Sequence, residues 1–305
     1  MFDLAILGGG PAGLTAAVYA ARKKLNTILI TKDIGGQVMT TMDVENYMGY
    51  QYIAGPELVD KFQKQVAIFP IEQKIGEGVT ALTRLNRHFE ISVDSGQTFA
   101  ARAVIIATGK RPRPLNVPGE DKLRGKGVSY CAICDAPLFQ GLKVAVVGGG
   151  NSALEAVHDV LKYCPEVNLI SLTPLTCDKI LVDRVKEKID ERLKIFTEHE
   201  TLEVLGEERV EGLKMKSLKT GEITTLDVRG LFVEIGLVPN SDFVKDLLKL
   251  NDQGEIVVNK ACETGVPGLF AAGDVTDVPE KQIIVAAGEG SKATLQADRY
   301  LQRLS

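Results

Sequence analysis

The sequence predicts an α/β protein with two Rossmann-like, three-layer nucleotide-binding domains, the first of them discontinuous. Three observations support this prediction. A strand, a glycine-rich turn and a helix open the chain at residues 3–24, and the same unit recurs at residues 143–163. Three prolines within residues 110–118 indicate a connector between the two copies. The 305 residues, 45 % of them hydrophobic, are enough for two cores.

The first half of the chain alternates between short apolar runs and amphipathic segments. We expect strands at 3–7 and 25–31, with a helix between them that ends near residue 24, and a second helix over 57–69. Polar and apolar residues then alternate as in an antiparallel meander, and a last strand follows; these segments are 79–85, 88–93, 97–102 and 103–107.

After the connector the pattern restarts. The expected strands of this half are 143–147, 167–172, 195–204, 209–217, 223–228, 230–235 and 268–272, and the expected helices are 151–163, 178–193 and 291–303. The segment after residue 241 is too short to fold alone, so we expect it to rejoin the first domain. The predicted domains are residues 1–114 with 242–305, and residues 115–241.

Charge and composition narrow the class of partner. The formal net charge is −4 and no polybasic run stands out, so we expect neither a nucleic-acid partner nor a membrane surface. The N-terminal apolar stretch ends at a glycine cluster after a few residues, too soon for a signal peptide or a spanning helix. The expected location is the cytoplasm.

The first glycine-rich turn has the pattern GxGxxG between a strand and a helix. There, backbone N–H groups and the helix N-terminus can meet a pyrophosphate because no side chains intervene. Asp33, 20 residues past the last glycine and just beyond the expected strand end, is a candidate ligand of a ribose. The candidate residues of the turn are Gly8, Gly10, Pro11, Ala12 and Gly13.

A second acidic position follows a short strand near the C-terminus, in Gly273-Asp274. Asp274 there can accept hydrogen bonds from the ribityl chain of a flavin, which favours FAD over NAD at the first site; the alternative is a strand end that serves packing alone. Lys281, Gln282 and Ile283 follow at short range and are candidates to face the isoalloxazine ring.

Cys131 and Cys134 form the only close pair among five cysteines and have CxxC spacing. Two thiols at this spacing can close a disulfide that carries two electrons. Structural zinc is the weaker interpretation, because the chain has no second CxxC and its three histidines are scattered singly. Asp135 is a candidate proton donor to a departing thiolate, or a helix N-cap. We expect Cys164, Cys177 and Cys262 to be inert.

The second glycine-rich turn has the pattern GxGxxA and gives the second domain the frame of a nicotinamide nucleotide site. An NADPH site wants a basic residue at the end of the following strand and an NADH site an acidic one, yet residues 171–174 offer neither. Lys179 and Arg184 are candidates to compensate, so NADPH and NADH both stay open. The candidate residues of the turn are Gly148, Gly150, Asn151, Ser152 and Ala153.

These motifs together resemble the low-molecular-weight thioredoxin reductase family, including its relative, the flavoprotein reductase of the alkyl hydroperoxide system. The resemblance covers residues 2–303, in the short form without that reductase's extra N-terminal disulfide-carrying module. The motifs that carry it are Gly8 to Gly13, Gly35-Gly36-Gln37, Glu45-Asn46, Ala107-Thr108-Gly109, Cys131 to Asp135, Gly148 to Ala153, and Gly273-Asp274 with Gln282 behind them.

The resemblance implies an FAD domain interrupted by a nucleotide domain that carries the CxxC, usually as a homodimer. It implies that Cys134 lies next to the flavin, that Cys131 attacks the partner disulfide and that Asp135 is the acid. It also implies a rotation between the domains, with hinges near residues 112–118 and 238–244. The FAD-binding positions that it adds are Gly36, Gln37, Asn46, Ala107, Thr108 and Gly109.

Three hypotheses follow from the sequence. The first is a disulfide oxidoreductase that reduces thioredoxin or a similar small protein through FAD and the Cys131–Cys134 disulfide. The second keeps this reaction but takes electrons from reduced ferredoxin or another non-nicotinamide donor. The third is a non-catalytic flavin redox sensor.

Overall fold

The computed structural model describes residues 1–40, 44, 46–176 and 191–304, and the chain divides into two compact units. Unit 1 contains residues 1–111 and 238–305, and unit 2 contains residues 112–237. The domain boundaries expected from the sequence, at 114/115 and 241/242, lie a few residues away from these divisions. Unit 1 is therefore built from two separate stretches of the chain, and unit 2 is inserted between them.

Unit 1 is centred on a seven-stranded sheet. The sheet has the order β3-β2-β1-β6-β5-β4, and β17 pairs with β6. Its strands are β1 (Phe2–Gly9), β2 (Thr27–Ile34), β3 (Glu72–Ile75), β4 (Val79–Arg84), β5 (Phe89–Val93), β6 (Thr98–Ile106) and β17 (Leu269–Ala271). Strands β3, β2, β1, β6 and β17 run parallel to one another. Strand β5 pairs antiparallel with both β6 and β4. The parallel strands β1, β2, β6 and β17 bury apolar residues on both faces, which indicates a sheet covered on both sides.

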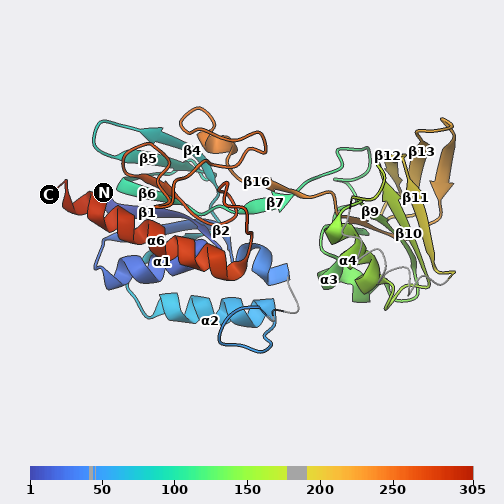
Figure 1. The fold of residues 1–305 in the computed structure, drawn as a ribbon, viewed down its shortest axis with the longest axis horizontal. Helices are drawn as coiled ribbons and strands as arrows, with labels where there is room; N and C mark the ends of the chain where they lie inside the picture. The colour runs from blue at the N-terminus through green and yellow to red at the C-terminus, as the bar shows by residue number, and fades with distance from the viewer. Residues whose placement is uncertain (41–43, 45, 177–190, 305) are drawn as a thin grey trace. The chain divides into compact units, whose positions relative to one another are not determined.

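Helices α1 (Pro11–Arg22) and α6 (Ile283–Gln302) lie side by side against one face of this sheet, next to α2 (Gly55–Ala67), as Figure 1 shows. Gly290 makes this close approach possible, because a Cβ there would lie 2.0 Å from the Ala12 carbonyl oxygen. The sequence predicted a helix only from residue 291. The observed helix begins earlier, at Ile283, and Gly290 lets it pack closely against α1.

The meander predicted in the first domain needs one correction. The segments 97–102 and 103–107 form the single strand β6, because no turn residue interrupts the apolar run between them. Its first residues pair with β5, and its later residues pair with β1 and β17.

Unit 2 has three layers. A five-stranded parallel sheet with the order β11-β10-β9-β15-β8 has helices on one face and an antiparallel three-stranded sheet, β12-β13-β14, on the other. The helical segments are α3 (Ala132–Asp135), the 3₁₀ turn η2 (Ala136–Phe139) and α4 (Asn151–Val160). The strands are β8 (Val128–Ser129), β9 (Lys143–Val147), β10 (Glu166–Ser171), β11 (Leu193–Thr197), β12 (His199–Leu205), β13 (Gly212–Ser217), β14 (Ile223–Leu226) and β15 (Gly230–Val233).

Two short strands join the units as a ribbon. β7 (Lys110–Pro112) pairs with β16 (Leu237–Pro239), although the prolines of this connector argued against regular structure. The expected strand 195–204 is divided into β11 and β12, because Glu198 has a φ of 60° and breaks the extended backbone. Most of the expected helix 178–193 falls outside the described residues.

The fold class predicted from the sequence is confirmed: both units have Rossmann-like sheets covered by further layers. No helix in the described part of the chain is long and apolar enough to span a membrane.

Candidate functional site

The first glycine-rich turn places the uncapped N-terminus of α1 beside an open space. Gly13 packs so tightly that a Cβ would lie 1.8 Å from the Gly8 carbonyl oxygen, and a Cβ on Gly8 would lie 2.2 Å from the Ala107 oxygen. Gly10, the N-cap of α1, differs, because its added Cβ would meet nothing within 4 Å and no side chain caps the helix. The free amides of this end therefore face room for an anionic ligand.

Two other predicted segments of unit 1 meet this turn. A Cβ on Gly36 would lie 3.9 Å from the Gly10 Cα, and one on Gly273 would lie 3.0 Å from the Ala12 Cβ. Asp33 lies within β2 rather than beyond its end, because the strand continues to Ile34 as its backbone passes Gly9. Its side chain is exposed, so the place expected for a ribose ligand is reachable.

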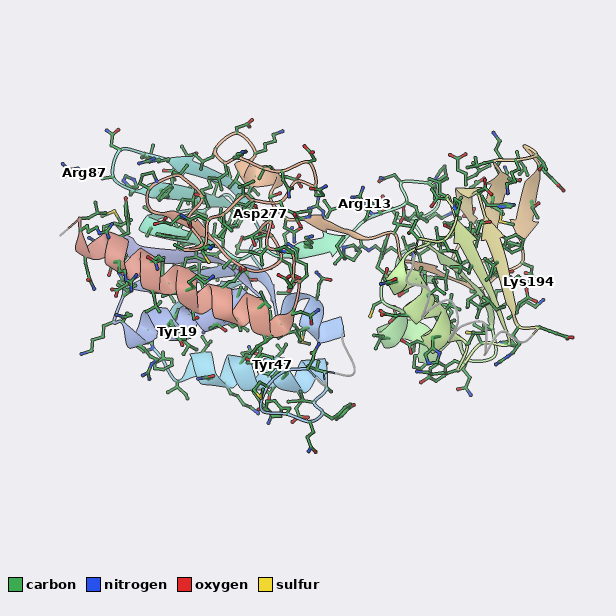
Figure 2. The ribbon with its side chains drawn as sticks, in the orientation of Figure 1. Tyr19, Tyr47, Arg87, Arg113, Lys194 and Asp277 are labelled. Atoms are coloured by element: carbon green, nitrogen blue, oxygen red, sulfur yellow. The ribbon has the colours of Figure 1, made fainter. Side chains whose placement is uncertain are left out.

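Further predicted residues are tied together by hydrogen bonds across long stretches of sequence. The Asn46 side-chain amide donates to the Gln282 side-chain oxygen at 3.1 Å, and the Gln37 amide donates to the Lys110 carbonyl at 3.4 Å. Tyr47, labelled in Figure 2, packs its ring against Phe62 on α2 at 5.6 Å between centroids and anchors the segment that carries Asn46.

The Ala107-Thr108-Gly109 segment follows β6 and is fixed on both sides. The Ala107 N–H donates to the Leu7 carbonyl, and the Thr108 hydroxyl donates to the Asn240 carbonyl at 2.7 Å. The Asn240 side chain returns a hydrogen bond to the Thr108 carbonyl at 2.8 Å, and Gly109 turns the chain with a φ of 62°. These hydrogen bonds therefore fix the segment beside the first glycine-rich turn.

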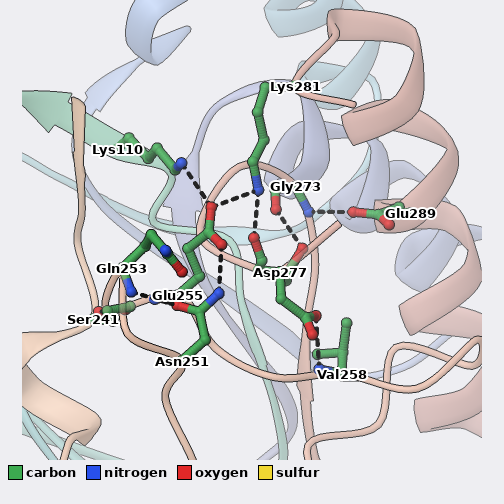
Figure 3. Close-up of polar contacts among 12 residues, drawn as sticks. Lys110, Ser241, Asn251, Gln253, Glu255, Val258, Gly273, Asp277, Lys281 and Glu289 are labelled. Atoms are coloured by element: carbon green, nitrogen blue, oxygen red, sulfur yellow. Dashed lines mark hydrogen bonds and ion pairs between the residues drawn. The ribbon is translucent and has the colours of Figure 1, made fainter. Parts of the chain in front are cut away.

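A buried carboxylate links two of these segments, as Figure 3 shows. Glu255 binds the ammonium groups of Lys110 and Lys281 at 2.8 and 3.0 Å and accepts a third hydrogen bond from Asn251. Burial alone would raise the pKa of Glu255, but the hydrogen bonds from Lys110, Asn251 and Lys281 outweigh it and lower the pKa to about 2. Two cations share one carboxylate here, so the cluster keeps a net positive charge. Sequence reasoning found Lys281 but missed Glu255 and Lys110.

Asp274 is half-buried in the same region. Burial raises its pKa, while the charges of Lys281 and Lys110 act in the opposite direction. The preceding residue, Gly273, is held by Glu289 of α6, whose carboxylate accepts the Gly273 N–H at 2.8 Å. Burial raises the pKa of Glu289 as well. A cationic pair thus lies near two carboxyl groups that could accept hydrogen bonds from ligand hydroxyls.

The predicted residues of unit 1 fit the dinucleotide that the sequence suggested. The space at Gly10 adjoins free helix amides suited to a pyrophosphate, and the Gly36, Gly109 and Gly273 turns leave the neighbouring backbone bare. A side chain at these glycine positions would occupy the space beside the backbone. Glycines are therefore the expected lining of a site that a cofactor enters.

In unit 2, Cys131 is disulfide-bonded. Its backbone is held on both sides: the Cys131 N–H donates to the Ser129 hydroxyl at 3.0 Å, and the Asp135 N–H donates to the Cys131 carbonyl at 3.2 Å. Asp135 is half-buried at the end of α3. The Cys134 side chain lies outside the described part of the structure, and the CxxC spacing predicts it as the disulfide partner.

The segment leading into the CxxC is anchored by a fully enclosed carboxylate. Glu120, 2 % exposed, accepts the backbone N–H groups of Leu115 and Asn116 at 2.8 and 2.7 Å, and the Tyr130 hydroxyl at 2.7 Å. Because Tyr130 immediately precedes Cys131, these hydrogen bonds hold the backbone that leads into Cys131.

Glu234 is a residue of this unit that sequence reasoning missed. It follows the four buried residues of β15, its N–H donates to the Val147 carbonyl, and its carboxylate accepts the backbone N–H of Ala132 inside the CxxC. Burial raises its pKa to about 7, and the nearby charge of Glu155 adds to this rise. The detectable signal was one acidic residue at the carboxyl end of an otherwise apolar parallel strand.

The second glycine-rich turn repeats the geometry of the first. A Cβ on Gly148 would lie 2.1 Å from the Glu234 carbonyl, whereas Gly150, the N-cap of α4, faces open space. Ser171 ends β10 with its hydroxyl toward Gly149, where a Cβ would lie 2.3 Å from it. Of the other predicted residues, Asn151 and Ser152 are exposed and Ala153 is buried.

The described residues at the end of β10 lack the charge that a nucleotide ribose or its phosphate would require. Ser171 is buried and neutral, and Leu172 is 58 % exposed, so the end of β10 offers neither an acid nor a base. Lys179 and Arg184, the candidates to compensate, lie outside the described residues, as does Cys177.

The two remaining described cysteines lie in the core of their units. Cys164 and Cys262 are free and buried, and burial raises the pKa of each thiol to about 11. Among the residues whose positions are given, no group of three or more His, Cys, Asp or Glu side chains is placed to hold a metal.

Two Rossmann-like units in one chain, one of them with a disulfide-bonded cysteine at a CxxC, are typical of a class of disulfide oxidoreductase. The family model described as pyridine nucleotide-disulphide oxidoreductase matches residues 2–290, and the chain belongs to this family. The family consists of flavin-dependent enzymes, and FAD is the cofactor of the chain.

Known relatives resemble the chain over its whole length. A Pseudomonas putida protein, one of the subunits of alkyl hydroperoxide reductase, is 42 % identical over 309 residues, which cover 100 % of this chain and 59 % of that protein. The chain thus spans about three fifths of the length of such curated relatives. Thioredoxin reductase from Lactococcus lactis matches with a TM-score of 0.87 at 33 % identity, covering 99 % of this chain and 100 % of that one. The T. acidophilum thioredoxin reductase matches with a TM-score of 0.83 at 36 % identity, covering 100 % and 99 %.

Proposed function

We propose that the chain reduces the disulfide of a thioredoxin-like protein through FAD and a Cys131–Cys134 disulfide. The observation that carries this proposal is the disulfide-bonded state of Cys131 within a CxxC, in the same chain as a glycine-rich turn with an open helix N-terminus. The two thioredoxin reductases that match nearly end to end favour a thioredoxin-like substrate. FAD, when bound, would accept and donate electrons in pairs.

The two cysteines complete the reaction by thiol–disulfide exchange. Two electrons open the Cys131–Cys134 bond, and the Cys131 thiolate then attacks one sulfur of the partner disulfide and expels the other as a thiolate. Cys134 next attacks the mixed disulfide, which restores the Cys131–Cys134 bond and releases the partner as a dithiol. Each expelled thiolate takes up one proton, and we assign Asp135 as the group that delivers it.

Residues of unit 1 would hold the cofactor. We assign the pyrophosphate to the amides at Gly10 and Gly13, the ribose to Asp33 and the ribityl chain to Asp274. Lys281, Gln282 and Ile283, at the start of α6, would face the flavin ring, with Asn46 supporting Gln282 through their hydrogen bond.

Cysteine variants of the purified yellow protein test this proposal. With photoreduced flavin and oxidised thioredoxin, Cys131→Ser and Cys134→Ser should each lower the release of thioredoxin thiols by at least about a hundredfold, because neither can pass on an electron pair alone. Cys164→Ala, which removes a free and buried cysteine of the same unit, is the matched control. Full activity in Cys131→Ser would contradict the proposal.

The electron donor forms a second part of the proposal. The family of the chain makes NADPH or NADH the first candidate donor, and a reduced ferredoxin or a similar protein is the alternative, because Ser171 and Leu172 provide no charge for a ribose or a 2′-phosphate. An anaerobic titration decides this: bleaching of the flavin by reduced ferredoxin but not by micromolar NADPH or NADH supports the protein donor. Rapid bleaching by either nucleotide overturns it.

We also propose a homodimer, which light scattering tests.

A further inference from the structure

The cluster of Lys110, Glu255 and Lys281 contains two cations and one anion (Figure 3). Both ammonium groups contact the same carboxylate oxygen of Glu255, at 2.8 and 3.0 Å, and no other carboxylate among the described residues lies within ion-pair distance of either. The three side chains are only 13–24 % exposed, so water screens their charges weakly. The cluster therefore presents a surplus positive charge to its surroundings.

Glu255 is held in a fixed place within this cluster. The Asn251 side-chain amide donates to the second carboxylate oxygen of Glu255 at 2.7 Å, and the Asn251 side-chain oxygen accepts the Glu255 N–H at 2.8 Å. The Lys281 ammonium also donates to the carbonyl of Thr276. The fold thus determines where both ammonium groups lie, because each is bound to this fixed carboxylate.

The two long helices of unit 1 run in the same direction. Gly290 of α6 packs on the carbonyl of Ala12, and four residues later the Thr294 hydroxyl donates to the carbonyl of Ala16 at 3.3 Å. Both contacts advance by four residues along α1 and along α6. The N-termini of the two helices therefore point toward the same end of the sheet.

The start of α6 extends past the first glycine-rich turn. Ile283, the first residue of α6, precedes Gly290 by seven residues, which is about 10 Å of helix at 1.5 Å per residue. Because Gly290 lies level with Ala12, the N-terminus of α6 lies beyond the N-terminus of α1. A dinucleotide whose pyrophosphate binds at α1 would thus extend toward the start of α6, and Lys281 immediately precedes the N-cap of that helix.

We propose that Glu255 is a positioning residue of the flavin site, which holds Lys110 and Lys281 so that their surplus positive charge raises the reduction potential of bound FAD. The inference rests on the placement of the flavin ring proposed above. On reduction the ring takes up two electrons from a donor and one proton from solvent, and so gains one negative charge. A nearby cation stabilises that product more than the uncharged oxidised ring.

Two other carboxyl groups of this region leave the surplus in place. Asp274 and Glu289 form no ion pair with Lys110 or Lys281 in the described part of the chain, and the Glu289 carboxylate accepts the Gly273 N–H. Burial raises the pKa of both groups, which favours their uncharged forms. Glu255 is therefore the direct counter-charge of the two lysines.

The reduction potential of the bound flavin tests this inference. Every variant is made in a Cys131→Ser, Cys134→Ser background of the full-length, FAD-loaded protein, so that the flavin alone takes up electrons. Each protein is reduced slowly under anaerobic conditions together with a reference dye. Absorbance then gives the ratio of reduced to oxidised flavin at each potential.

Lys281→Met and Glu255→Gln should shift the potential in opposite directions. Lys281→Met removes a positive charge, so the ratio of reduced to oxidised flavin at a given potential should fall about tenfold, a shift of about −30 mV for a two-electron couple. Glu255→Gln removes the negative charge but keeps an oxygen for both ammonium groups, so the ratio should rise by a similar factor. Loosened packing alone would not produce shifts of opposite sign.

Lys260→Met, at an exposed position of the same unit, is the matched control and should leave the ratio unchanged. If the purified chain takes up no FAD, the proposed cofactor site fails and this inference fails with it. If FAD is bound but Lys281→Met and Glu255→Gln have the potential of the control, or shift it in the same direction, the inference alone is wrong.

Discussion

The two glycine-rich turns share a backbone arrangement but have different charged neighbours. In each, a glycine packs against a carbonyl oxygen and an N-cap glycine leaves the helix end open. Lys110 and Lys281 lie in the unit of the first turn, whereas Glu234 and Glu155 lie by the second. The comparison teaches that the glycines build the frame, and that residues outside the motif decide which charge the frame accepts.

The largest expected effect comes from giving the first turn a residue that the second already has. Gly13→Ala copies Ala153, but its Cβ would lie 1.8 Å from the Gly8 oxygen, so we expect a loss of about 3 kcal/mol in the free energy of unfolding and loss of bound flavin. Denaturant unfolding and flavin absorbance measure both.

Gly10→Ala is the matched control for that experiment. Its Cβ enters open space, so the free energy of unfolding should change by no more than about 0.5 kcal/mol while flavin retention falls. Equal destabilisation by both variants would contradict the distinction between packing and ligand-facing glycines.

Breaking the cationic cluster of unit 1 should have the next largest effect. Glu255→Gln removes the carboxylate that pairs with the nearly buried ammonium groups of Lys110 and Lys281. We expect the free energy of unfolding to fall by about 2 kcal/mol at pH 7. Because the folded-state pKa of Glu255 is about 2, below its unfolded value, its contribution is complete above about pH 4.5 and is lost as pH falls toward 2.

Unfolding curves at pH 3 and pH 7 check this expectation. The difference between the unchanged protein and Glu255→Gln should shrink at pH 3, and Glu263→Gln, an exposed position in the same unit, should show no such change. A constant difference would mean that packing, rather than charge, explains the loss.

A single base should move the second turn toward the charge preference of an NADPH site. Leu172→Arg places a guanidinium at the exposed end of β10, and one charge-assisted contact should raise NADPH affinity by roughly tenfold, about 1.4 kcal/mol. Fluorescence titration measures the affinity, with Leu172→Gln as the neutral control. No gain for Leu172→Arg would mean that this strand end does not meet a 2′-phosphate.

The smallest effect concerns stability near the disulfide. The folded-state pKa of Glu234, about 7, exceeds its unfolded value, so the native state holds the extra proton and stability falls as pH rises from about 4.5 to 7. Glu234→Gln should therefore be more stable than the unchanged protein at pH 8, by about 1 kcal/mol. Thermal unfolding at pH 5 and pH 8 tests whether the gain appears only at the higher pH.

Sequence patterns predicted the two Rossmann-like frames because glycine spacing and apolar periodicity are local signals. The family resemblance added Asn46, which the structure joins to Gln282 by a hydrogen bond. Sequence patterns missed Glu255, because its pairing with Lys110 spans 145 residues and depends on how the sheet brings the segments together. Glu234 escaped for a related reason: its meaning comes from the neighbouring Ala132 amide rather than from its own position in a motif.

The insertion of unit 2 between the two parts of unit 1 has a consequence for synthesis on the ribosome. Residues 112–237 are contiguous, so unit 2 can fold as soon as they emerge. Unit 1 must wait, because its first helix packs against α6, which is translated only after the whole of unit 2. Until then the apolar face of α1 lacks its cover, so the nascent flavin unit is the part of the chain most in need of protection from aggregation.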